Sequence, residues 1–166
     1  MHTDSPKPDL PKPKKNYVTT RRLTEPELFE RASQLIEERF QRGDAYCEPK
    51  AVKDFLQYKL AHKDREVFSI MLLDSQHRLI EYREMFAGTI NAAPVYIREI
   101  IKAVVQTNAA AVICSHNHPS GVPEPSRADI SVTERLKKAL DLIDVTLLDH
   151  IVVGETTVSF AERGLL

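Results

Sequence analysis

The chain has 166 residues, a length that fits one domain with a single hydrophobic core. Its 23 Lys and Arg nearly balance its 24 Asp and Glu, so the net charge of −1 gives no overall field that would attract nucleic acid or an anionic membrane. No apolar run approaches the ~20 residues of a membrane-spanning helix, and the N-terminus lacks the apolar core of a signal peptide. Cys47 and Cys114 stand far apart outside any CxxC motif, which argues against a disulfide framework and a cysteine zinc site. We therefore expect a cytoplasmic protein with no membrane partner.

Residues 1–17 predict a disordered N-terminal tail, because they hold four of the ten prolines and almost no apolar side chains. The lysines of this tail, followed by Arg21 and Arg22, are either a solvated basic segment or a weak contact for nucleic acid. The sequence leaves both interpretations open.

Residues 18–43 predict one N-terminal helix. A capping box between Thr24 and Glu27 favours its start, and Gly43 is a plausible end. The residues expected on its inward face are Leu28, Ala32, Leu35 and Ile36.

Residues 44–166 alternate between strand-like and helix-like patterns, which predicts the α/β class with one mixed sheet. In chain order we expect a helix from Pro49, a strand over 66–74, a returning strand over 79–86, a helix over 92–107, a strand over 109–115, a loop over 116–126, a helix from Ser126, and strands over 145–153 and 156–160. The apolar stripes of the later two helices are expected to include Val105 and Ile143.

Two histidines and one carboxylate form the candidate functional site of this sequence. His116 and His118 follow a buried strand, and Asp129 lies in the first turn of the next predicted helix. These are ligand types of a catalytic Zn²⁺, and three protein ligands leave a fourth position for water. There are plainer interpretations: the histidine pair can be solvated, and Ser126 with Asp129 can simply be a capping box.

Two further residues near this motif have more than one interpretation. His150 lies inside a predicted strand, where it would either orient a metal ligand or bond to a neighbour as an ordinary histidine. Cys114 is most simply a small buried hydrophobe, and a place near the metal is the alternative.

The motif HxH-x7-SxxD, from His116 to Asp129, resembles that of the JAMM (MPN+) metalloproteases. The wording HNHPSG, preceded by AAAVICS and followed by LLDHIVVG, resembles the RadC family more closely still. This resemblance implies an MPN fold over residues 44–166, which is a curved mixed sheet flanked by helices. It also implies a Zn²⁺ hydrolase that acts on a peptide or protein amide, with His116, His118 and Asp129 as metal ligands.

The resemblance also implies two catalytic residues. Ser126 matches the serine that steadies the tetrahedral oxyanion, and a glutamate upstream of the motif serves as general base and then acid. Glu66 is the best match, because it stands at the head of the first apolar strand. Glu84 and Glu99 are the alternatives.

The sequence departs from the family pattern in two places. Residues 18–43 show no glycine-rich helix-hairpin-helix, the module that binds the DNA backbone in longer RadC members. Asn117 stands where deubiquitinating JAMM proteins have Ser or Thr. The rival hypothesis is a non-catalytic MPN scaffold associated with DNA repair, which the resemblance to RadC implies and the basic tail weakly supports. A non-haem iron oxygenase shares the two-His-one-carboxylate ligand set, but the chain lacks the all-β pattern expected of that class.

Overall fold

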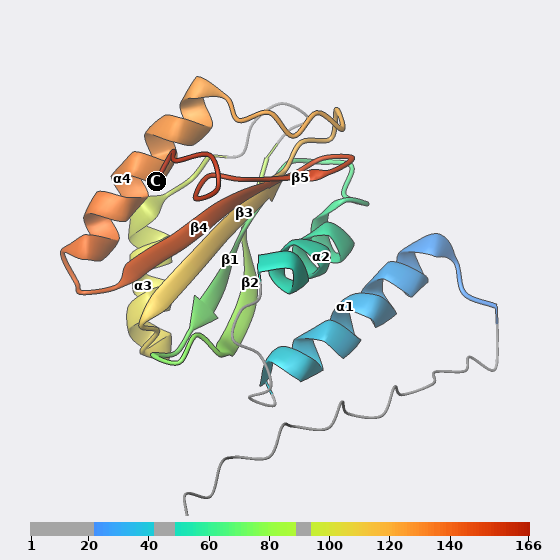
Figure 1. Ribbon diagram of the computed structural model, residues 1–166, viewed down its shortest axis with the longest axis horizontal. Helices are drawn as coiled ribbons and strands as arrows, with labels where there is room; N and C mark the ends of the chain where they lie inside the picture. Colours follow the sequence, from blue (N-terminus) through green and yellow to red (C-terminus); the bar gives the residue numbers. More distant parts are fainter. Residues whose placement is uncertain (1–21, 42–48, 89–93) are drawn as a thin grey trace, which may run out of the picture.

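The computed structural model describes residues 22–41, 49–88 and 94–166 (Figure 1). The elements in chain order are α1 (Glu25–Gln41), α2 (Pro49–Leu60), β1 (Val67–Leu73), β2 (Leu79–Ala87), α3 (Ile97–Thr107), β3 (Ala111–Asn117), α4 (Arg127–Asp141), β4 (Thr146–Val153) and β5 (Thr157–Ser159). The predicted α/β class is confirmed. The predicted tail over 1–17, the helix stop at Gly43, the start of a helix at Ala92 and Cys47 lie outside the described residues.

The five strands form one mixed sheet in the order β2-β1-β3-β4-β5. β1 pairs antiparallel with both β2 and β3, β5 pairs antiparallel with β4, and β3 runs parallel to β4. The parallel pair needs a crossover connection, and α4 provides it. The N-terminus of α4 therefore lies near the C-terminal end of β3.

Helices cover both faces of the sheet, with α2 on one face and α3 and α4 on the other (Figure 1). Beneath α2, Phe55 and Leu56 are fully buried against apolar residues of β1, β3 and β4. On the opposite face, Ile100 and Leu140 anchor α3 and α4. Because its two faces are both covered, β3 is buried along its whole length, which explains its continuous apolar run.

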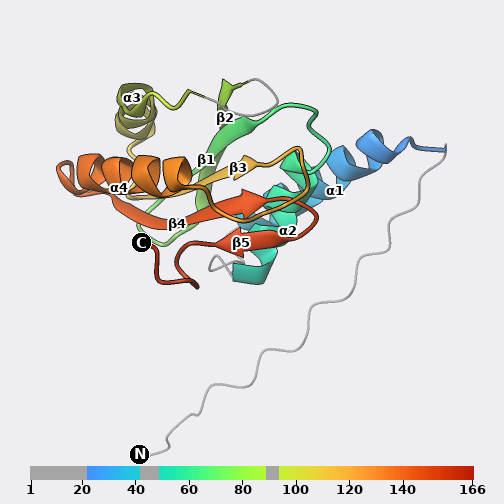
Figure 2. The same cartoon turned by 90° about the horizontal axis from the view of Figure 1, so that it is seen from above.

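The first helix packs on the second rather than on the core of the sheet (Figure 2). Phe29 of α1 lies 6.1 Å from the rings of both Tyr58 and His62, measured between ring centroids. Across the same seam, the Lys59 ammonium lies 3.5 Å from the Glu30 carboxylate. Within the described ranges, no helix combines the length and the apolar character that crossing a membrane requires.

A register shift in the β3–β4 pairing changes which side chains share a face. Val112 pairs with Leu147, but the next residue, Ile113, pairs with Asp149, so Leu148 is the extra residue. Side chains alternate between faces along a strand, and one extra residue therefore moves every later side chain to the other face. As a result His150 pairs with Cys114, on the same face as His116.

Several expectations about burial and boundaries were wrong. Leu28, Val105 and Ile143 were expected to face inward, but they are 57%, 60% and 36% exposed. The apolar stripes that include Leu28 and Val105 extend onto exposed sides of their helices, and Ile143 lies beyond the end of α4 at Asp141. α3 begins at Ile97, and His116 belongs to β3 rather than to the following loop.

The end of α4 offers a matched test of this packing. Leu140 is fully buried, whereas Leu142, two residues on, is 85% exposed. We expect Leu140→Ala to lower the free energy of unfolding by about 2–5 kcal/mol, because it leaves a cavity between α4 and the sheet. Leu142→Ala should change it by less than about 0.5 kcal/mol. Chemical denaturation measures both, and equal losses would contradict the packing of α4.

Candidate metal centre

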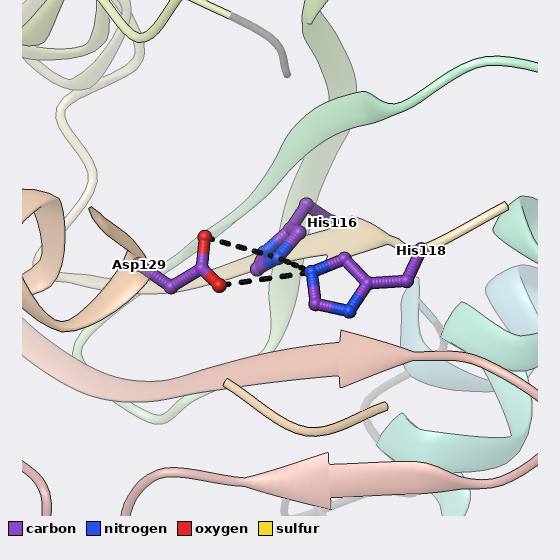
Figure 3. Close-up of side chains that lie close together, drawn as sticks. All are labelled: His116, His118 and Asp129. Carbon is purple, nitrogen blue, oxygen red and sulfur yellow. Dashed lines mark hydrogen bonds and ion pairs between the residues drawn. The ribbon is translucent and has the colours of Figure 1, made fainter. Parts of the chain in front are cut away.

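Three side chains converge at the C-terminal edge of β3: His116 near the end of this strand, His118 in the loop that follows it, and Asp129 in the first turn of α4 (Figure 3). One ligand atom from each of His116, His118 and Asp129 lies within 4.8 Å of the others. The Asp129 carboxylate is 3.3 Å from Nε2 of His116 and 3.6 Å from Nε2 of His118. The two Nε2 atoms are themselves 3.0 Å apart. This group could hold a metal ion.

The first turn of α4 orients the Asp129 carboxylate. Ser126 caps the helix, and its hydroxyl oxygen accepts a hydrogen bond from the Asp129 N–H at 3.1 Å. In return, Asp129 Oδ2 accepts hydrogen bonds from both the N–H and the hydroxyl of Ser126 at 2.7 Å. Partial burial opposes ionisation of Asp129, but the bonds with His116 and Ser126 outweigh it and hold the pKa of this carboxyl below its usual value. The capping box and the converging carboxylate are therefore the same structure.

His118 is oriented by the loop that follows it. Its Nδ1 lies 2.8 Å from the main-chain oxygen of Val122, so Nδ1 donates and Nε2 keeps its lone pair. The loop is bound to the β4–β5 turn, since the His118 N–H donates to Val153 O and the Glu155 N–H donates to Gly121 O. The same turn approaches so closely that a Cβ on Gly154 would lie 2.3 Å from Gly121 O.

His116 is oriented by a second histidine. It is almost fully buried, stacks on Phe68, and places Nδ1 2.8 Å from Nε2 of His150. His150 is fully buried as well, and burial, reinforced by the charge of His116, lowers its pKa well below the usual value. Nδ1 of His150 lies 2.6 Å from the hydroxyl of Thr133 on α4. The structure therefore places His150 in direct contact with His116, one of the predicted metal ligands.

Asn117, between the two histidines, binds the segment that precedes β1. Its carboxamide oxygen accepts a hydrogen bond from the Val67 N–H at 2.8 Å. Its amide nitrogen donates to the main-chain oxygens of Arg65 at 2.9 Å and Lys63 at 3.3 Å. All of these bonds are directed at the main chain on either side of Glu66. From the sequence, Asn117 was only a departure from the family pattern, and this role was not predicted.

The predicted catalytic glutamate lies beside the group but outside it. Glu66 directly precedes β1, in which Phe68 pairs with His116. Since side chains alternate along a strand, position 66 belongs to the same face as Phe68. Its role as a general base stays a prediction.

The alternatives to Glu66 are engaged elsewhere. Glu84, on β2, forms an ion pair with Lys63 at 2.9 Å, and Glu99, in the first turn of α3, lies 3.4 Å from Arg98. Cys114 is buried on β3, and burial, together with the charge of Asp149, raises the pKa of its thiol. Its thiol is not part of the converging group, which supports its interpretation as a buried hydrophobe.

The comparisons with known proteins agree with this arrangement. Residues 46–165 match the sequence profile of a family described as RadC-like JAB domain. A UPF0758 protein of Idiomarina loihiensis is 62% identical over 140 residues, which cover 84% of this chain and 62% of that relative. Two UPF0758 proteins of Vibrio cholerae are 49% and 53% identical, over 93% and 90% of this chain and 98% and 96% of theirs. The chain thus spans less than two thirds of the Idiomarina protein, and it matches the Vibrio proteins almost end to end.

The contact at Gly154 generates a test of how the loop is held. In Gly154→Ala the new methyl group must displace Gly121, so we expect a loss of about 1–3 kcal/mol in unfolding free energy. The amide chemical shifts of His118, Ser120, Gly121 and Val122 should move, because the displacement reaches His118. Gly164→Ala is the control, since its Cβ meets nothing within 4 Å and should leave those shifts unchanged. Wild-type stability and shifts in Gly154→Ala would contradict the close approach.

Proposed function

The chain belongs to the RadC-like JAB domain family, and from that membership and the geometry of the metal centre we propose that it is a zinc-dependent hydrolase of amide or isopeptide bonds. The observation that carries the proposal is the convergence of His116, His118 and Asp129 within 4.8 Å at the mouth of the β3–α4 connection. Ligands of active sites in sheets with parallel strands gather at this edge, beyond the carboxyl ends of the strands.

The donor set of the three residues suits zinc. Imidazole nitrogens and a carboxylate oxygen are ordinary Zn²⁺ ligands, and both Nε2 atoms face the carboxylate. A zinc ion held by these residues would lower the pKa of a bound water to about 7 and polarise the scissile carbonyl. Ferrous iron accepts the same donor set, but the mixed α/β sheet is not the all-β fold expected of the iron oxygenases.

We assign the proton transfers to Glu66. Its carboxylate would take a proton from the attacking water and deliver it to the nitrogen of the leaving amine. Support comes from Asn117, whose hydrogen bonds to Arg65 and Val67 hold the main chain on both sides of Glu66. The segment that carries the base is thereby attached to the end of β3, between the two histidines.

Ser126 is the proposed donor to the oxyanion. In this structure the hydroxyl donates a hydrogen bond to Oδ2 of Asp129, with 2.7 Å between the two oxygens, so donation to a substrate requires that the hydroxyl turn away from the carboxylate. Removal of one oxyanion donor typically costs about 2.7–4 kcal/mol of transition-state stabilisation.

The substrate is proposed by chemical class alone, as a peptide or protein amide. The names of the relatives state no activity, and the longer Idiomarina protein is matched over 62% of its length. The nucleic-acid contact predicted for the basic tail concerns residues that lie almost entirely outside the described ranges, and both this contact and the DNA-repair scaffold stay predictions.

Metal analysis tests the ligand set. We expect the purified protein to hold about one zinc per chain after dialysis, and His116→Ala combined with His118→Ala to hold none. His77→Asn is the control, because His77 lies in the exposed β1–β2 turn at φ 58°, a conformation that asparagine tolerates. Mass spectrometry of the metal also distinguishes zinc from iron. Full zinc in the double variant would refute the assignment.

The role of Glu66 is tested separately. We expect Glu66→Gln to keep its zinc and to lose about 10²–10⁴-fold in kcat/KM, because the amide cannot accept the water proton. Cleavage of a defined peptide library, which includes isopeptide-linked members, gives the rate. Glu84→Gln and Glu99→Gln are matched controls that should retain activity. An active Glu66→Gln beside an inactive Glu84→Gln would move the role to Glu84.

A further inference from the structure

We propose that His150 and Thr133 are positioning residues that hold the proton of His116 on Nδ1 and so present the lone pair of its Nε2 to the metal. This inference rests on the proposed function, because it assigns the orientation of one ligand of the same centre. It concerns two buried residues that make no direct contact with the metal position.

A continuous chain of hydrogen bonds carries the proposal. Nδ1 of His116 lies 2.8 Å from Nε2 of His150. Nδ1 of His150 lies 2.6 Å from the Thr133 hydroxyl, which in turn lies 2.6 Å from the main-chain oxygen of Asp129. The three side chains are each at most 2% exposed, so water does not compete for these bonds.

The main-chain oxygen at one end of this chain of hydrogen bonds sets the direction of every bond in it. The Asp129 main-chain oxygen can only accept, so the Thr133 hydroxyl must donate its single proton there. The hydroxyl then accepts from His150, which places the His150 proton on Nδ1 and leaves its Nε2 as an acceptor. That acceptor takes the proton of His116 Nδ1. Nε2 of His116, which faces Asp129, is thereby left to bind a metal.

The chain of hydrogen bonds also connects two proposed ligands of the same centre. It begins at His116 on β3, crosses to His150 on β4 and ends at the main chain of Asp129 on α4. Partners of this kind orient a ligating histidine and fix its tautomer, and their loss typically weakens metal binding about 10–100-fold. His118 achieves the same tautomer with a single main-chain oxygen, that of Val122. His116 lies too deep in the sheet for that solution, and β4 supplies the acceptor instead.

Thr133→Val is the sharpest test, because valine keeps the shape and removes the hydroxyl. We expect its dissociation constant for Zn²⁺, measured by competition with a chelating dye, to rise about 10–100-fold. Thr133→Ser restores the hydroxyl and should return the constant to within about threefold of the wild type. Thr107→Val is the matched control: Thr107 also bonds the carbonyl four residues earlier in its helix, Ala103 O at 3.0 Å, but it lies on α3 away from the centre.

Nitrogen-15 NMR of the imidazole rings gives a readout that a merely structural role would not move. In the wild type, with or without zinc, His150 should be protonated on Nδ1 and unprotonated on Nε2. A scalar coupling across the hydrogen bond should connect Nε2 of His150 with Nδ1 of His116. Thr133→Val should lose this pattern, whereas Thr133→Ser and Thr107→Val should keep it.

The outcomes separate this inference from the proposed function. A wild type that binds zinc, beside a Thr133→Val variant of unchanged affinity, overturns the inference and leaves the hydrolase proposal standing. A proton on Nε2 of His150 in the wild type overturns it as well. A wild type that takes up no zinc contradicts the proposed function. It also overturns this inference, because His116 would then not be a zinc ligand.

Discussion

Parallel pairing of β3 with β4 is the constraint on which the centre depends. A parallel pair forces the chain to cross back over the sheet, and α4 makes that crossing from a point beside the end of β3. The imidazole of His116 and the carboxylate of Asp129 are thereby brought within 3.3 Å, although thirteen positions separate them in the chain. Their approach is a property of the β3–α4–β4 unit, which the buried β3 strand holds at the centre of the sheet.

Each converging side chain also uses its other polar atoms to fix its direction. Nδ1 of His118 bonds a main-chain oxygen, Nδ1 of His116 bonds His150, and Oδ2 of Asp129 is bound by Ser126. Groups held in this way lose little conformational freedom when a ligand binds, so binding energy is not spent on ordering them. The same principle extends to Glu66, whose flanking main chain is held by Asn117. Asn117, the middle residue of HxH, thus joins the strand that carries His116 to the segment of the proposed base.

Local signals in the sequence were sufficient to predict much of the fold and of the candidate site. Continuous apolar residues indicated the buried β3, and Ser126 with Asp129 indicated a helix start, which is also where the structure has its N-cap. The spacing from His116 to Asp129 indicated both the family and the converging group. These features were predictable because each is encoded within a few residues or within one connection. Apolar periodicity was less informative at surfaces: Leu28 and Val105 repeat with their helices and are nevertheless exposed, because periodicity does not reveal where a neighbouring element ends.

The sequence alone determined the alternation of strands and helices, the residue types of the candidate metal centre and their order along the chain. Tertiary structure alone decided what surrounds them. His150 lies on the face of His116 because one extra residue, Leu148, shifts the register between β3 and β4. Thr133 reaches His150 because α4 packs against β4, and Asn117 reaches Arg65 and Val67 because β1 lies beside β3. Register and packing are set by contacts between segments far apart in the chain, and no local pattern of residues records them.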